Sequence, residues 1–348
     1  MKNRIAISQN IQGLRGLAAI LVVIYHIYKY EIIINEEGFL SSFWTIGRTG
    51  VDIFFVISGY IMVMISDPKK TGTRAATGFA LRRIFRVYPL YWFFSFIILP
   101  IYLLQPQLFN RMGDSSDLNL WKSFLLIPQS NLAPLVGQGW TLIHEMYFYI
   151  IFSFLILFSQ KLRNPLIFTW ATVIAIFVWG VEAPKSPILD LALSPLTFEF
   201  LFGCGVALLH KNDLTKFGWV ILLSGLGIFC FSETSSHGVN RLYWMGIPSA
   251  LIVWGAVSLE LENQWQAPSW LVKIGDTSYS LYLCHILVLS ALLKVWKMFE
   301  FSNYLHTGFM CAAMFCASII TGFLIHRWVE KPLIQISKVI LTKICPRF

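Results

Sequence analysis

The chain has 348 residues, of which 56% are hydrophobic and only 13% are charged, with a net charge of +9. Soluble domains carry about 25% charged residues, so this composition excludes an ordinary water-soluble domain and indicates a polytopic membrane protein. The basic residues form short clusters between apolar stretches. That distribution is typical of the cytoplasmic loops of membrane proteins and argues against nucleic-acid binding.

Apolar stretches of about 17–25 residues, long enough to cross a bilayer, recur along the whole chain. We therefore expect an all-α membrane protein with about ten transmembrane helices, near residues 13–30, 50–66, 86–104, 139–158, 165–181, 190–209, 217–232, 242–259, 277–296 and 307–326. The tail after the last stretch is too short to fold alone. Residues 1–348 are expected to form a single transmembrane domain with no fused soluble domain.

Lys and Arg are unequally distributed between alternate loops. With the N-terminus in the cytoplasm, the cytoplasmic segments hold 19 of the 27 Lys and Arg residues. This asymmetry predicts that both termini are cytoplasmic. Residues 260–273 fit that orientation least well, because they carry two Glu and only one Lys.

Six cysteines are scattered along the chain, most of them inside apolar stretches. They form no C-x-x-C pair and none accompanies a histidine at metal-ligand spacing, so we expect neither a disulfide framework nor a bound metal.

The first apolar stretch contains two ionisable residues, Arg15 and His26. Ionisable groups at membrane depth are costly and tend to mark function. The two residues are 11 positions apart, close to three helical turns, so they project from one face about 16 Å apart along the axis. A packing histidine and an arginine that reaches the cytoplasm would give the same pattern, and this alternative stays open.

The second stretch begins with RTGVDIFFVISGYIM, in which Arg48 and Asp52 are four residues apart. Side chains at this spacing pair on one helical face. Ser58 and Gly59 offer a hydroxyl and a close approach to another helix. An architectural role is the simpler interpretation of this segment.

The third stretch opens with LRRIFRVYPLYW, which places Arg82, Arg83 and Arg86 close together. Guanidinium groups match the geometry of phosphate oxygens, so the cluster is a candidate phosphate site. Three arginines at this position are also an ordinary cytoplasmic anchor of a membrane helix.

The fourth stretch, GWTLIHEMYFYIIF, starts near Trp140 and brings Glu145 roughly 10 Å below the outer surface. His26, placed from the inner side, lies at a similar depth. A carboxylate facing an imidazole orients the ring and favours its protonated form, which prepares a general base. A purely structural His–Glu pair is the alternative, and His144, about 100° round the helix, competes with Glu145 for the same direction.

Two later segments carry further polar residues. GDTSYSLYLCHILVL places Ser278, Tyr282 and His285 on one wide helical face, and HRWVEKPL ends the last stretch with Glu330 and Pro332. Packing and helix termination also explain these residues.

Taken in order, these segments resemble the membrane-bound acyltransferase-3 family. The features that carry the resemblance are Arg15 with His26, and the segments GVDIFFVISGY, RRIFRVYP, WTLIHEMYFY, SYSLYLCH and VEKP. They occur here in the family's order and cover essentially the whole chain. Family members without a fused soluble domain include bacterial exopolysaccharide and O-antigen O-acetyltransferases. His144, before Glu145, departs from the family pattern.

The resemblance implies transfer of an acyl group, usually acetyl, from cytoplasmic acyl-coenzyme A to a carbohydrate hydroxyl at the outer side of a bacterial inner membrane. It implies that His26 is essential, with Arg15 as the other half of its motif. Arg83 and Arg86 fall on the family's R-x-x-R, which is linked to coenzyme A. Glu145 falls on the acidic position of the fourth-helix motif.

From these residues we predict a membrane O-acyltransferase with His26, Glu145 and Arg15 as catalytic residues. The predicted acyl-coenzyme A contacts are Arg82, Arg83 and Arg86, and the residues expected to shape the site are Arg48, Asp52, Ser58, Trp140, Tyr282 and His285. His26 can act as a general base or take the acyl group itself, and the sequence does not separate the two.

The alternative function is a proton-coupled transporter of a sugar or lipid-linked intermediate, because a buried His–Glu pair also serves proton relays. Carriers often show two related halves, and none is recognisable in this chain. The arginine cluster also fits an acyl-coenzyme A enzyme better than a carrier.

Overall fold

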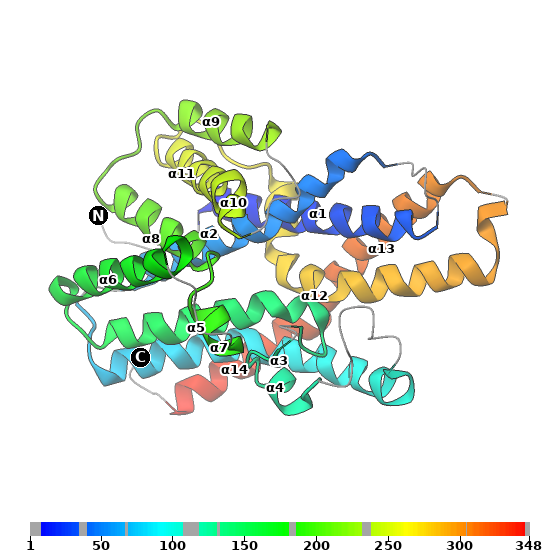
Figure 1. Ribbon diagram of the computed structural model, residues 1–348, viewed down its shortest axis with the longest axis horizontal. Coiled ribbons are helices and arrows are strands. Elements are labelled where there is room, and N and C mark those ends of the chain that lie inside the picture. Colours follow the sequence, from blue (N-terminus) through cyan, green and yellow to red (C-terminus); the bar gives the residue numbers. More distant parts are fainter. Residues whose placement is uncertain are drawn as a thin grey trace. The chain divides into compact units, whose positions relative to one another are not determined.

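The computed structural model describes residues 8–34, 40–66, 69–106, 118–130, 133–180, 186–231, 238–303 and 305–344 (Figure 1). Within these ranges all regular structure is helical, which confirms the predicted all-α fold. In the same ranges nine helical stretches are long and apolar enough to cross a membrane: Gln9–Ile32, Ser42–Ile65, Thr73–Leu104, Gly137–Ile156, Gln160–Trp179, Pro187–Lys211, Val239–Leu261, Ser269–Met298 and Thr307–Lys343.

The remaining predicted span, residues 217–232, corresponds to a shorter apolar helix. This helix, α9 (Gly218–Cys230), has 13 residues, which gives a length of about 20 Å against a hydrocarbon core of about 30 Å. Full-length spans in the described ranges therefore number nine rather than ten. Two termini on one side of a membrane need an even number of crossings, so the predicted orientation depends on α9 and stays a prediction.

The chain divides into two compact units, residues 1–61 with 202–328 and residues 62–201 with 329–348. The elements of the first unit are α1 (Gln9–Ile32), η1 (Ser42–Arg48), most of α2 (Thr49–Ile65), most of α8 (Thr197–Lys211), α9, α10 (Val239–Arg241), η5 (Leu242–Gly246), α11 (Ile247–Leu261), α12 (Ser269–Met298), η6 (Phe301–Asn303), α13 (Thr307–Ile325) and the start of η7 (His326–Glu330). The elements of the second are α3 (Thr73–Leu104), α4 (Leu120–Phe124), η4 (Gly137–Gly139), α5 (Trp140–Ile156), α6 (Gln160–Trp179), α7 (Pro187–Ala192) and α14 (Lys331–Ile344). The single-domain organisation stays a prediction.

In the first unit, α1 packs lengthwise along α12 (Figure 1). Small residues make this possible, because a side chain at Gly275 would meet the backbone of Gln12 and one at Gly16 would meet the backbone of Leu271. Close backbone approach through glycine is the usual way in which membrane helices gain packing contacts. The contact holds the two helices in one register along their length.

The N-terminus of α1 is capped from a distant part of the chain. Glu260 accepts hydrogen bonds from the backbone N–H of Gln9 at 2.9 Å and of Asn10 at 2.8 Å, and also from the Ser8 hydroxyl. Asn10 is fully buried and bonds the carbonyl of Ala256 at 2.6 Å. A carboxylate is favourable at a helix N-terminus. Glu260 is one of the two Glu residues that made residues 260–273 fit the predicted orientation least well. In the structure it caps α1.

In the second unit, α3 packs against α5 and α14 (Figure 1). The helix begins at Thr73, 13 residues before the predicted start at residue 86. Arg82, Arg83 and Arg86 therefore lie inside α3 and not at its entry. Hydropathy located only the apolar part of the helix. The polar turns that precede it, from Thr73 on, belong to the same helix.

Large apolar side chains are exposed on several of the candidate spans. Phe96 on α3, Ile150 on α5, Phe168 on α6 and Phe309 on α13 are each more than 60% exposed. Apolar surface on this scale is unfavourable in water and is expected where helices face lipid.

Candidate active site

Two histidines that are 259 residues apart in the sequence lie next to each other in the first unit. Nε2 of His285 on α12 lies 3.3 Å from Nδ1 of His26 on α1, and their ring centroids are 4.9 Å apart at an interplanar angle of 63°. Nδ1 of His26 also lies 2.8 Å from the carbonyl oxygen of Val22, one helical turn earlier. His285 is fully buried, whereas His26 is partly accessible. The α1–α12 packing thus brings the histidine of the first apolar stretch against the histidine of SYSLYLCH.

Aromatic rings surround this histidine pair. The Tyr25 ring meets His26 edge-on with centroids 4.9 Å apart, and the Tyr282 ring lies 5.8 Å from that of His285. Phe54 on α2 packs at 6.1 Å from Tyr282. Tyr282 therefore lies beside His285, and its predicted role in shaping the site stays a prediction.

Arg15 is linked to α12 through a neighbour on its own helix. Its Nη1 donates to Oε1 of Gln12 at 2.8 Å, and Nε2 of Gln12 donates to Asp276 on α12, also at 2.8 Å. Because α1 is one continuous helix from Gln9 to Ile32, Arg15 and His26 lie on one side of it. The spacing of 11 residues predicted this arrangement.

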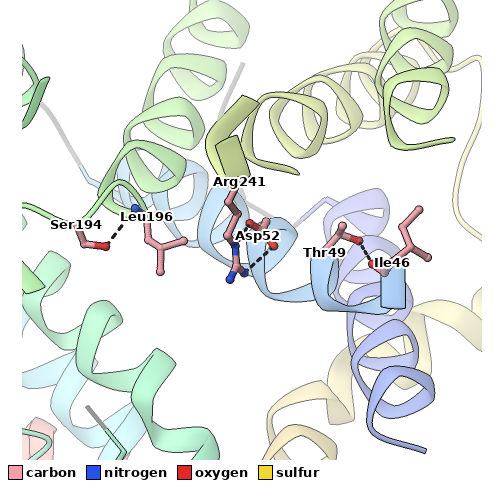
Figure 2. Close-up of polar contacts among 6 residues, drawn as sticks. All are labelled: Ile46, Thr49, Asp52, Ser194, Leu196 and Arg241. Atoms are coloured by element: carbon pink, nitrogen blue, oxygen red, sulfur yellow. Dashed lines mark hydrogen bonds and ion pairs between the residues drawn. The ribbon is translucent and has the colours of Figure 1, made fainter. Parts of the chain in front are cut away.

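Asp52, at the start of α2, forms a two-pronged ion pair with Arg241 of α10 (Figure 2). Nε and Nη2 of Arg241 donate to the two carboxylate oxygens, each at 2.9 Å. Asp52 is fully buried and the Arg241 side chain is 13% exposed. The predicted pairing of Asp52 with Arg48, which ends η1 just before α2, stays a prediction.

Thr49 and Ser58 occupy buried positions on α2. The Thr49 hydroxyl donates to the carbonyl of Ile46 at 2.8 Å (Figure 2). This bond closes the turn between η1 and α2, one turn before Asp52. Ser58 lies two turns further along the same helix.

In the second unit, Glu145 and Arg83 are linked through Tyr149. The Tyr149 hydroxyl donates to the Glu145 carboxylate one turn earlier on α5. The guanidinium carbon of Arg83 on α3 lies 5.5 Å from the ring centroids of both Tyr149 and Phe79. Aromatic faces attract a cation at this distance. The R-x-x-R segment and the fourth-helix segment thus form one cluster.

The three arginines of α3 that were predicted to contact acyl-coenzyme A have different surroundings. Nη1 of Arg86 donates to Glu330 at 2.7 Å, and Glu330 is only 2% exposed. Arg82 is exposed. Nε of Arg83 is buried and has no hydrogen-bond partner in the described part of the chain. Glu330, which the sequence analysis read as a termination residue, therefore acts as the counter-ion of Arg86.

His26 belongs to the first unit and Glu145 to the second, so their predicted pairing stays a prediction. Trp140 begins α5, and its ring meets the His144 ring edge-on with centroids 5.9 Å apart. His144 is buried while Glu145 is partly exposed. The two neighbours on α5 thus occupy different surroundings, as their separation of about 100° requires.

Arg241 and Glu31 are charged residues, largely and fully withdrawn from solvent respectively, that the sequence did not single out. Arg241 carries no local signal, because its partner Asp52 is 189 positions away. Glu31, fully buried on α1, accepts from the backbone N–H of Leu40 at 2.9 Å. The sequence did contain a signal for Glu31, because this residue stands between Tyr30 and three isoleucines. A carboxylate in such an apolar segment is costly unless it has a partner.

Comparison with known proteins gives the class of the chain. A family model described as an acyltransferase domain matches residues 8–323. Exopolysaccharide production protein ExoZ of Rhizobium meliloti (strain 1021) is 28% identical over 84% of this chain and 91% of its own length. Acyltransferase MdmB of Streptomyces mycarofaciens is 23% identical over 97% of this chain and 94% of its own.

A protein of Staphylococcus aureus (strain COL), provisionally named an O-acetyltransferase, is 25% identical over 92% of this chain and 56% of its own length. No solved structure matches the chain.

The chain belongs to the acyltransferase-3 family, as its sequence motifs predicted. It is a multi-pass membrane O-acyltransferase, and this finding decides against the alternative of a transporter.

Proposed function

We propose that the protein transfers an acetyl group from acetyl-coenzyme A to a hydroxyl group of a surface or extracellular polysaccharide, in a bacterial inner membrane. The relatives named for exopolysaccharide production and for O-acetyl transfer support the acceptor and the acyl group. The observation that carries the proposal is the hydrogen bonding of the His26 ring. Its Nδ1 is engaged by a backbone carbonyl, and Nε2 is left as the basic nitrogen.

The chemistry follows from that hydrogen bond. A carbonyl oxygen only accepts, so Nδ1 of His26 carries the proton and Nε2 keeps its lone pair. The acceptor hydroxyl attacks the thioester carbonyl carbon and gives its proton to Nε2 of His26. The carbon–sulfur bond breaks, and the coenzyme A thiolate leaves with the proton that His26 returns. In the variant route, Nε2 takes the acyl group first and passes it to the hydroxyl.

We propose Arg83 as the main contact for the phosphates of the acyl donor. It is a cation next to two aromatic rings, and its Nε–H has no acceptor in the described part of the chain. Guanidinium N–H groups bond phosphate oxygens strongly. Exposed Arg82 adds charge at the same level of α3, while Arg86 is held by Glu330 and steadies the junction of α3 with α14.

The remaining predicted residues have supporting roles in this proposal. Arg15 provides positive charge on the same side of α1 as His26, and Glu145 with Tyr149 positions Arg83. We propose that both termini are cytoplasmic, so that the donor enters from the cytoplasm. The polysaccharide hydroxyl enters from the opposite side, and α2, which carries Asp52, shapes its access.

The test compares cells that express wild type, His26→Ala and His306→Asn at matched membrane levels. His306 caps α13 through Nδ1, which accepts from the N–H of Gly308 at 3.0 Å, and Asn supplies an equivalent acceptor. We expect the O-acetyl content of surface polysaccharide to fall to background for His26→Ala and to stay normal for His306→Asn. Normal acetylation by His26→Ala would overturn the proposal.

A second assay addresses the donor directly. Detergent-solubilised protein is incubated with acetyl-coenzyme A and an O-deacetylated polysaccharide, and free coenzyme A thiol is measured. We expect thiol release that depends on both substrates and on His26. Acetylation of polysaccharide in cells without any thiol release from acetyl-coenzyme A would show that the donor is a different acyl carrier.

A further inference from the structure

We propose that His285 is a positioning residue for His26: the Nε2 lone pair of His285 accepts the Nδ1 proton of His26 and holds that ring with Nε2 as the base. This inference rests on the proposed function of His26. It gives His285 the orienting role that the sequence analysis assigned to Glu145.

The tautomers of both rings follow from two backbone carbonyls. Nδ1 of His285 lies 3.2 Å from the carbonyl oxygen of Leu281, one turn earlier on α12. Because this oxygen only accepts, Nδ1 of His285 carries the proton and its Nε2 keeps the lone pair. That lone pair lies 3.3 Å from Nδ1 of His26, whose proton is already directed at the Val22 carbonyl. The His26 proton is therefore shared by two acceptors.

The packing of the helices holds this geometry. Close glycine contacts set the register of α1 and α12, and the Tyr30 hydroxyl contacts the Ser290 hydroxyl at 2.6 Å one turn beyond the histidines. Leu281 and Leu289, on either side of His285 along α12, are buried in the same core as Ile27 of α1. The packing therefore fixes the helix positions that carry the two rings.

A histidine has a specific advantage as the orienting group. When Nε2 of His26 takes the hydroxyl proton, the ring becomes a cation in a poorly hydrated site. The Nδ1 proton of this imidazolium stays shared between the Val22 carbonyl and Nε2 of His285, and both acceptors stabilise the positive charge. His26 then gives its Nε2 proton to the coenzyme A thiolate as the thiolate leaves. A neutral imidazole also costs less to bury than an unpaired carboxylate.

The test compares His285→Phe with His285→Gln. Phe fills the volume of the ring but offers no acceptor, whereas the Gln side-chain oxygen can accept the Nδ1 proton of His26. We expect His285→Phe to lower kcat by at least about tenfold with an unchanged KM for acetyl-coenzyme A. His285→Gln is expected to recover most of that loss. A residue that only packs would give the opposite order, since Phe preserves the packing better than Gln.

A spectroscopic measurement reads the tautomers directly in the wild-type protein. The chain has seven histidines, and ¹⁵N-labelled imidazole signals of His26 and His285 are assigned by comparison with His26→Gln and His285→Gln. We expect both rings to carry the proton on Nδ1. A His26 ring protonated on Nε2 and bare at Nδ1 would overturn the inference, as would a wild-type kcat for His285→Phe.

The two proposals fail in different ways. If His26→Ala is inactive while His285→Phe turns over normally, the inference about His285 is wrong and the proposed function stands. If His26→Ala is fully active, the proposed function is wrong, whatever tautomer the rings adopt.

Discussion

Asp52 and Arg241 form two parallel hydrogen bonds of 2.9 Å across 189 residues of sequence. The pair ties the first turn of α2 to the short helix α10 (Figure 2). Both side chains are largely withdrawn from solvent, Asp52 completely. A buried carboxylate is tolerated because its partner is geometrically matched, and α2 is thereby held where Phe54 meets Tyr282 beside the histidines.

Removal of one partner of this pair is expected to destabilise the protein. Arg241→Met leaves the Asp52 charge buried without compensation, which costs about 3–5 kcal/mol. The double variant Asp52→Leu with Arg241→Met removes both charges and is expected to regain much of that loss. Apparent unfolding temperatures in detergent, with membrane levels, provide the measurement. An equal drop in unfolding temperature for the single and double variants would show that the uncompensated charge of Asp52 does not cause the destabilisation.

The close contact between α1 and α12 predicts a strong effect at one glycine. Gly275→Ala places a methyl group against the backbone of Gln12, so the helices must separate and the histidines with them. We expect activity to fall sharply and the unfolding temperature to drop.

The matched control is Gly205→Ala on α8, where an added methyl group meets nothing within 4 Å. Helix propensity alone favours Ala over Gly by about 1 kcal/mol, so this variant is expected to be neutral or slightly more stable. Equal stability of the two variants would show that α1 and α12 tolerate a wider spacing.

The remote cap of α1 predicts a modest stability effect. Glu260→Ala removes the acceptor of the Gln9 and Asn10 N–H groups, and loss of a helix cap costs roughly 1 kcal/mol. Thermal unfolding of this variant is compared with that of Glu300→Gln, which changes an exposed Glu beyond the end of α12. A lower unfolding temperature is expected for the first variant only. Indistinguishable curves would mean that Ser8 caps the helix sufficiently by itself.

The different surroundings of the α3 arginines predict different kinetic effects. Arg83→Lys loses the planar guanidinium that lies 5.5 Å from the ring centroids of Phe79 and Tyr149, and the compact ammonium of Lys is not equivalent to it. We expect the KM for acetyl-coenzyme A to rise at least about tenfold with little change in kcat. Glu330→Gln weakens the hold on Arg86 and is expected to lower stability with a smaller effect on KM. The same KM for both variants would contradict the assignment of Arg83 to the donor phosphates.

The sequence by itself determined the helices and their class. Segment hydropathy located the nine stretches that can cross a membrane in the described ranges, because the bilayer sets the length of an apolar helix. Helical periodicity placed Arg15 and His26 on one side of α1, and the motif order identified the acyltransferase-3 family. Hydropathy placed the start of α3 too late and predicted a full membrane span where α9 has only 13 residues. The reason is that hydropathy reports the apolar core of a helix and not its hydrogen-bonded ends.

Only the tertiary structure decided which side chains meet. His285 lies against His26, Arg241 against Asp52 and Glu260 against the start of α1, although about 190 to 260 residues separate the members of each pair. Local spacing carries no information on such contacts, because they depend on which helix faces pack. Here glycine positions and the burial of apolar side chains select those faces. The histidine pair and the buried ion pair follow from that packing.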